Sequence, residues 1–182
     1  LRGRMSGWTS PKDVILALAG RLTVKGGTNA IIEYFGEGTA TLSATGKATI
    51  CNMGAEVGAT TSMFPFDGHT ASFLEATGRA AVAAWAQGVA ADLCADPEVE
   101  AEPHRFYDEV IEIDLAALQP HVNGPFTPDA ACTVADMPQR VQAEGFPTAV
   151  EAVLIGSCTN SSDQDMARAA SVVKAMRAEG HA

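Results

Sequence analysis

The segment VEAVLIGSCTNSSDQDM, residues Val150–Met166, contains the pattern on which the fold prediction depends. Its apolar run Val153–Ile155 has the length and composition of a buried strand, and Gly156 ends that run. A block of small polar residues around Cys158 follows, and from Asp163 onward apolar residues recur at helical spacing. The segment therefore predicts a strand, a turn that holds Cys158, and a helix.

Cys158 is the candidate functional residue of this turn. Backbone N–H groups and the positive end of a helix dipole gather between a strand end and a helix start. Both lower the pKa of a thiol, and the resulting thiolate is a metal ligand or a nucleophile. A lone cysteine after a strand is more often a small core residue, with neighbouring Ser, Thr and Asn as helix caps. The spacing alone favours the structural interpretation and leaves the functional one open.

A second helix is predicted over residues 43–57, in which apolar residues such as Ile50 and Val57 recur on one face. Asn52 and Glu56 lie at i and i+4, one turn apart on another face. Their neighbours are almost all small or apolar, so a buried setting is expected, in which a carboxylate must be paired, protonated or used. The alternative is a solvated polar stripe.

Strands are expected to alternate with helices along the chain. Ser10 and Pro11 predict a helix start, and residues 31–35 and 110–114 read as strands. This alternation predicts an α/β fold, with three-layer α/β/α domains and a largely parallel sheet. Sites in such sheets lie at the carboxyl ends of strands, where Cys158 is expected.

A domain boundary is predicted at the acidic stretch 93–103, which reads as an exposed, irregular linker. Residues 1–92 are interpreted as the end of one α/β/α domain, and residues 104–182 as the start of the next. The chain begins without Met and stops in or just after a predicted helix, so we interpret it as an internal piece of a larger protein. A missing targeting segment then says nothing about location.

Composition excludes some classes of function. The 182 residues carry a formal net charge of -10, which disfavours a nucleic-acid surface, and no apolar run approaches the roughly 18 residues of a membrane span. The cysteines lie far apart without a CxxC pair, which favours a reducing compartment over a disulfide framework.

Four segments together resemble the aconitase family in its mitochondrial type. GSCTNSS at Gly156–Ser162 is similar to the first cysteine signature of that family. ATICNMGAEVGATTSMFPF at Ala48–Phe66 is similar to an active-site segment. SGWTSPKDVI at Ser6–Ile15 and HVNGPFTPD at His121–Asp129 also resemble the family, in the expected order. The resemblance covers nearly the whole chain.

The resemblance implies an enzyme of the tricarboxylic acid cycle in the mitochondrial matrix, monomeric as a full-length protein. It would interconvert citrate and isocitrate through cis-aconitate by removing and re-adding water. A 4Fe–4S cluster held by cysteines supplies a Lewis-acidic iron for this chemistry. No nucleic-acid or membrane partner is expected.

The resemblance also assigns residues. Cys158 matches the first cluster cysteine, and Asn52 and Glu56 match active-site residues near the exchangeable iron. Asn160, in the same turn as Cys158, is given a cofactor-binding role that supports the ligand. Cys51, Cys94 and Cys132 receive no ligand role and are interpreted as structural or surface thiols.

Other parts of the family site are not found in this sequence. These are the second and third cluster cysteines, an Asp-Ser-His segment, the arginines that bind substrate carboxylates and a catalytic serine. Since one thiolate does not hold a four-iron cluster, we expect the chain alone neither to assemble a stable cluster nor to turn over citrate. The alternatives are a homoaconitase or isopropylmalate dehydratase large subunit, an RNA-binding relative, which the charge disfavours, and a cluster-free remnant.

Overall fold

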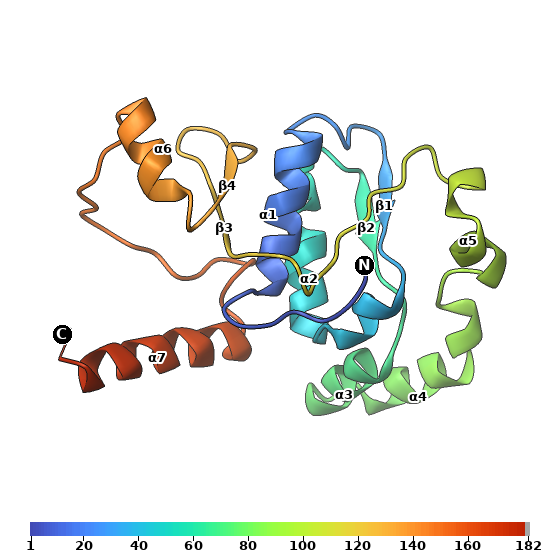
Figure 1. The fold of residues 1–182 in the computed structure, drawn as a ribbon. Helices are drawn as coiled ribbons and strands as arrows, with labels where there is room; N and C mark the ends of the chain where they lie inside the picture. The colour runs from blue at the N-terminus through green and yellow to red at the C-terminus, as the bar shows by residue number, and fades with distance from the viewer. Residues whose placement is uncertain (181–182) are drawn as a thin grey trace.

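In the computed structural model, which describes residues 1–180, the chain folds around the adjacent helices α1 and α2 (Figure 1). The last residues of the predicted second unit, His181 and Ala182, lie outside the described part. The α-helices are α1 (Pro11–Leu22), α2 (Ala44–Asn52), α3 (Gly68–Ala76), α4 (Ala80–Gly88), α5 (Pro97–Ala101), α6 (Met137–Glu144) and α7 (Asp163–Ala178). The 3-10 helices are η1 (Glu37–Thr41), η2 (Met53–Val57), η3 (Ala90–Asp92) and η4 (Pro103–Arg105). The strands are β1 (Ile31–Glu33), β2 (Thr61–Met63), β3 (His121–Asn123) and β4 (Ala131–Thr133).

The strands form pairs beside the central helices. β1 and β2 are parallel, with Ile31 opposite Thr61, and β2 contacts α2. β3 and β4 are antiparallel, with His121 opposite Thr133, and both contact α1. The α/β class is confirmed, and so is a parallel pair that includes the predicted strand at residue 31. The β3–β4 pair was not predicted, because turn-forming residues dominate the sequence that follows His121.

The core lies between α1 and α2 and is closed by apolar residues from several loops. The start of α1 follows the sequence rules: the backbone N–H and the hydroxyl of Ser10 both donate to Asp13, at 2.6 and 2.9 Å. Gly46 lets the two helices approach, since a Cβ there would lie 2.6 Å from Pro11. The buried cluster comprises Val14, Ile15, Leu16, Leu18, Tyr34, Leu42, Ile50, Met53, Ile113 and Leu115.

The segment 110–114 was predicted to be a strand and is not one. Its burial alternates as expected, with Ile113 and Leu115 buried in the core and Glu112 and Asp114 exposed. Its backbone forms an isolated bridge with Arg2, through bonds of 3.0 and 2.8 Å. A strand needs a longer partner to satisfy its backbone groups, and Arg2 provides a single bridge.

The predicted buried strand Val153–Ile155 is also wrong. These residues have no strand structure, and the exposed fractions are 81% for Val153, 88% for Leu154 and 53% for Ile155. Among residues 1–180 nothing pairs with this backbone or covers these side chains. The predicted helix after it does form, as α7, which projects away from the body of the molecule (Figure 1).

The predicted helix over residues 43–57 divides in two. Ser43 caps α2 by accepting from the Gly46 N–H at 3.1 Å, and α2 passes into η2 after Asn52. Ile50 and Val57 are fully buried, as the apolar spacing predicted. The buried setting expected for the polar pair is wrong for Asn52, which is exposed, while Glu56 is half-buried. A 3-10 helix has about three residues per turn, so Glu56 no longer shares a face with Asn52.

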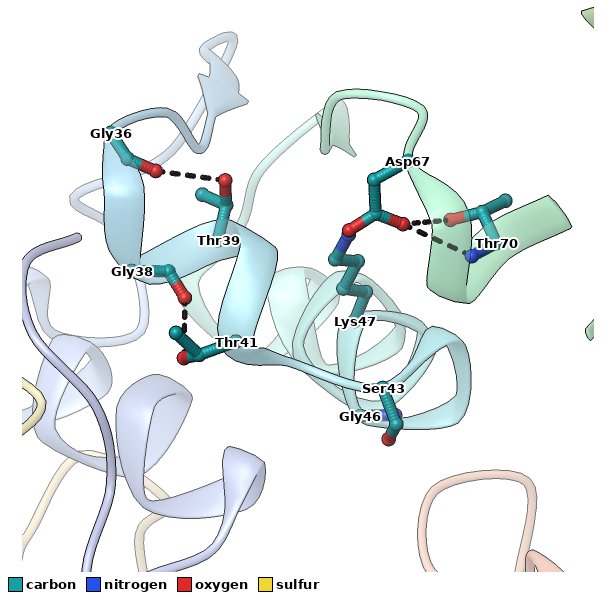
Figure 2. Close-up of polar contacts among 9 residues, drawn as sticks. All are labelled: Gly36, Gly38, Thr39, Thr41, Ser43, Gly46, Lys47, Asp67 and Thr70. Carbon is teal, nitrogen blue, oxygen red and sulfur yellow. Dashed lines mark hydrogen bonds and ion pairs between the residues drawn. The ribbon is translucent and has the colours of Figure 1, made fainter. Parts of the chain in front are cut away.

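An ion pair joins α2 to α3. The Lys47 ammonium, whose side chain is only 6% exposed, lies 2.5 Å from a carboxylate oxygen of Asp67 (Figure 2). The other oxygen of Asp67 accepts from the N–H and the hydroxyl of Thr70, each at 3.0 Å, and so caps α3. This contact fixes the helix that carries Asn52 against the next part of the chain.

The acidic stretch 93–103 is largely exposed, as predicted, but it is not irregular. It contains α5, which begins at Pro97, and η4 begins at Pro103. Proline is favoured in the first turn of a helix, and the acidic residues that follow Pro97 suit the positive end of the helix dipole. The domain boundary itself stays a prediction.

Candidate functional site

Two segments that are far apart in sequence meet at the end of α2. The side-chain amide of Asn52 lies 3.2 Å from Cys158 Sγ and 3.0 Å from Thr159 Oγ1, and donates to both. Asn52 comes from the NMGAE segment and Cys158 from the GSCTNSS segment. The structure therefore brings together two residues that the sequence singled out separately.

The turn that holds Cys158 is bound along α2 by further polar contacts. Thr49, one turn before Asn52, donates its hydroxyl to the Thr159 carbonyl at 2.8 Å. At the other end of α2, Ser43 and Thr45 donate to Gln164 Oε1 at 2.7 and 3.0 Å. Sequence reasoning missed these contacts. The available signal was the spacing of Thr49 and Asn52, which places them on one face of a helix.

The Cys158 thiol is exposed and electrostatically shifted. Hydrogen bonds from the Asn52 amide and, next, the Thr159 hydroxyl lower the pKa of Cys158, because they stabilise the thiolate. Slight desolvation and the negative charge of Glu56 oppose this shift. The predicted cause was a helix start, but α7 begins at Asp163, more than one turn away, where a helix dipole acts weakly.

Glu56 lies close enough for its charge to act on Cys158. Within residues 1–180, its Oε2 atom is buried and has no hydrogen-bond partner. A buried acceptor without a partner is uncommon in proteins and indicates an oxygen that binds water, an ion or a ligand. This carboxylate oxygen is thus available to accept a hydrogen bond near the thiol.

Asn160 faces the start of α7 rather than Cys158. Its amide donates to Asp165 Oδ1 at 3.4 Å, and its own Oδ1 is buried without a partner among the described residues. Asp165 in turn accepts from Ser162, the N-cap of α7, at 3.1 Å from the N–H and 2.7 Å from the hydroxyl. Asn160 therefore stabilises the exit of the turn, and its cofactor-binding role stays a prediction.

The other cysteines have surroundings that differ from those of Cys158. Burial raises the pKa of the half-buried Cys51, Cys94 is exposed and donates to the Ala91 carbonyl, and Cys132 lies beside Met137. Over residues 1–180, no three His, Cys, Asp or Glu residues are grouped so that they could hold a metal ion. In this turn the described residues supply one sulfur donor, Cys158, which fits a single ligand position of an iron–sulfur cluster and not a whole set.

None of the helices in the described part of the chain is long and apolar enough to cross a membrane.

Comparisons with known proteins identify the family. The model of the aconitase family (aconitate hydratase) matches residues 1–182. The mitochondrial aconitate hydratase of Candida albicans is 58% identical over 181 residues, which are 99% of this chain and 22% of that relative. That of Saccharomyces cerevisiae is 56% identical over 181 residues, with the same coverage of 99% and 22%. The mitochondrial homocitrate dehydratase of Saccharomyces cerevisiae is 53% identical over 176 residues, 96% of this chain and 22% of that relative. The chain thus spans about a fifth of the length of the relatives it matches, and it belongs to the aconitase family.

Proposed function

We propose that this chain forms part of an aconitate hydratase, which interconverts citrate and isocitrate through cis-aconitate in the tricarboxylic acid cycle. The observation that carries the proposal is the contact of 3.2 Å between Asn52 and Cys158, which joins the two family motifs at one place. The mitochondrial aconitate hydratases among its relatives support the same reaction.

The proposed roles follow from the contacts. Cys158, with its exposed thiol and lowered pKa, would bind one iron of a 4Fe–4S cluster. Asn52 would hold the sulfur in place, and Asn160 would keep the turn in its shape through Asp165. When bound, the cluster supplies a Lewis acid that stabilises the hydroxide lost from the substrate.

Glu56 is the proposed catalytic carboxylate of this part of the site. Its unpartnered Oε2 is suited to accept a hydrogen bond from water or from the substrate hydroxyl. Its charge acts on the Cys158 thiol, so it would lie close to a cluster held there. The remaining cluster ligands and the groups that bind the substrate carboxylates would come from other parts of the protein.

Location and assembly belong to the same proposal. The mitochondrial names of the relatives support the mitochondrial matrix, and we propose a monomer without nucleic-acid or membrane partners. We also keep the division at residues 93–103 as a proposal. It places the core residues Ile113 and Leu115 in the second unit, so limited proteolysis should show whether a cut at the exposed α5 separates the two parts.

A second candidate is a homocitrate dehydratase, a related hydro-lyase. The 53% identity to such an enzyme over 176 residues supports it. The two functions differ in the side group of the substrate. A substrate panel separates them: citrate and isocitrate on one side, homocitrate and isopropylmalate on the other.

The test uses the full-length protein with its cluster reconstituted, assayed for cis-aconitate by ultraviolet absorbance. We expect turnover of citrate and isocitrate, and Cys158→Ser should abolish both cluster binding and turnover. Cys94→Ser is the matched control, since Cys94 is also exposed and free, and it should leave both unchanged. A loaded Cys158→Ser enzyme with full activity would remove Cys158 from the site. The 182-residue chain alone, with its single suitable thiol, should bind no stable cluster.

A further inference from the structure

Thr49 uses its side chain in an unusual way for a helical threonine. In a helix, a threonine hydroxyl commonly bonds to a carbonyl one turn earlier in the same helix. Thr49 is buried in α2, with 7% of its surface exposed, and donates instead to the backbone carbonyl of Thr159 at 2.8 Å. A buried donor that reaches a turn 110 positions away has a tertiary role.

The residue that Thr49 holds is the neighbour of Cys158. Thr159 is bound to α2 through two different atoms: its carbonyl accepts from Thr49, and its hydroxyl accepts from Asn52 at 3.0 Å. Two fixed atoms define both the position and the direction of the backbone that follows Cys158. The position of the Cys158 sulfur relative to Asn52 and Glu56 is therefore fixed.

Apolar packing does not provide this positioning. Within the described part of the chain, no residue from 147 onward is buried, and Leu154, just before the turn, is 88% exposed. The polar contacts with α2 are what keep the turn in place. Among these contacts, the donor of the Thr49 bond is buried within α2, whereas Asn52 is exposed. Water therefore competes least with the Thr49 bond.

We propose that Thr49 is a positioning residue for the Cys158 ligand, which acts through the carbonyl of Thr159. The inference rests on the proposed function, because Thr49 positions a cluster ligand only if Cys158 binds a cluster. Thr49 touches neither the cluster nor the substrate in this role. Its hydroxyl sets where the sulfur lies when a cluster assembles or is retained.

The first test is amide hydrogen exchange of residues 157–161 in the iron-free full-length protein. Thr49→Val keeps the shape of the side chain and removes the hydroxyl, and it should make these amides exchange about 3- to 10-fold faster. Thr49→Ser restores the hydroxyl and should exchange like the wild type. Thr49→Ala serves where the valine variant does not fold, with the same expected increase.

Thr39→Val is the matched control. Thr39 is also buried, 4% exposed, and its hydroxyl donates to the Gly36 carbonyl at 2.8 Å, within its own segment (Figure 2). It should leave the exchange of residues 157–161 unchanged. Equal exchange in the Thr49→Val and Thr39→Val variants would overturn the proposal, and so would fast exchange in Thr49→Ser, since the hydroxyl would then not be enough to hold the turn.

The second test is the rate of iron release from the cluster-loaded protein to a chelator. Thr49→Val should release iron several-fold faster, with Thr49→Ser and Thr39→Val at the wild-type rate. An unchanged rate in Thr49→Val would count against the role in holding the ligand. The exchange test needs neither a cluster nor turnover, so a wild type that makes no cis-aconitate would refute the proposed function without deciding the role of Thr49.

Discussion

The α1–α2 region and the segment from residue 147 to 180 are held by different forces. In the first, Val14, Ile15 and Ile50 are fully buried in a continuous apolar cluster. In the second, none of the described residues is buried, and side chains such as Gln164 and Arg168 attach it through hydrogen bonds to α2 and to the Trp8 and Thr9 carbonyls. Each region contributes one part of the candidate site.

The two kinds of force have different effects: apolar burial stabilises the α1–α2 region, and hydrogen bonds orient the Cys158 turn. Apolar burial is large and non-directional, so it fixes α2 in place but does not aim a side chain. Hydrogen bonds are individually small and directional, so they aim the Cys158 turn at α2. We therefore expect the Cys158 segment to open locally at a much lower free energy than the α1–α2 region.

The largest expected effect is Ile50→Ala. Ile50 is fully buried between the helices, so the cavity left behind should lower the free energy of unfolding by about 2–5 kcal/mol, measured by urea denaturation. Leu154→Ala is the control, since Leu154 is 88% exposed, and it should change stability by less than about 0.5 kcal/mol. Equal losses in the two variants would show that the two regions do not differ as described.

The next effect is at the ion pair between α2 and α3. Asp67→Asn leaves the buried Lys47 ammonium without its counter-charge and should cost about 1–3 kcal/mol near neutral pH. Glu144→Gln is the control. Its Arg140–Glu144 pair is more exposed, at 22% and 47%, and should cost less than about 1 kcal/mol.

The same ion pair predicts a dependence of stability on pH. Burial by itself raises the pKa of Asp67, but the Lys47 ion pair and the hydrogen bonds from Thr70 outweigh it and lower the pKa below 3.8. A carboxyl whose pKa is lowered by folding contributes stability above its unfolded pKa and loses it as the pH falls. The wild type should therefore lose stability below about pH 3.8 more steeply than Asp67→Asn, and parallel curves would contradict this.

A smaller effect is expected at the attachment of α7. Gln164→Leu removes the acceptor that Ser43 and Thr45 share, and should change global stability by at most about 1 kcal/mol. Amide exchange in the first turn of α7 should nevertheless rise several-fold. The control is Gln142→Leu at an exposed site on α6, which should leave α7 as it is. No change in α7 exchange would mean that other contacts hold this helix.

The smallest effect on stability is expected for Asn52→Ala. Asn52 is exposed, so unfolding should change by less than about 0.5 kcal/mol. Its amide is the largest cause of the lowered Cys158 pKa, so the alkylation profile of Cys158 in the iron-free protein should move to higher pH. Alkylation of the exposed Cys94 in the same samples is the internal control, and its profile should not move. An unmoved Cys158 profile would remove Asn52 as the group that stabilises the thiolate.

Local patterns in the sequence predicted local structure well. Ser10 and Pro11 marked the start of α1, and the spacing of Ile50 and Val57 gave the buried face correctly. These features depend on residues within a few positions of one another. The alternating burial of segment 110–115 followed from the same kind of pattern, although its backbone lacks a strand partner.

Features that depend on distant partners were predicted less well. The run Val153–Ile155 has strand composition, but a strand needs a neighbour, and the described chain provides none. The shared face expected for Asn52 and Glu56 failed because α2 tightens into η2 just after Asn52. The β3–β4 pair was not predicted because both strands are short and a loop rich in turn-forming residues separates them in the sequence.

The sequence alone determined the family, the α/β class, the starts of α1, α2 and α7, and the candidate residues Asn52, Glu56, Asn160 and Cys158, because motifs and caps are encoded over short stretches. Only the tertiary structure decided that Asn52 lies 3.2 Å from the Cys158 sulfur and that Thr49 holds the turn through Thr159. Those contacts join positions more than a hundred residues apart. Their distance depends on how α1, α2 and the loops pack, and no local pattern specifies that packing.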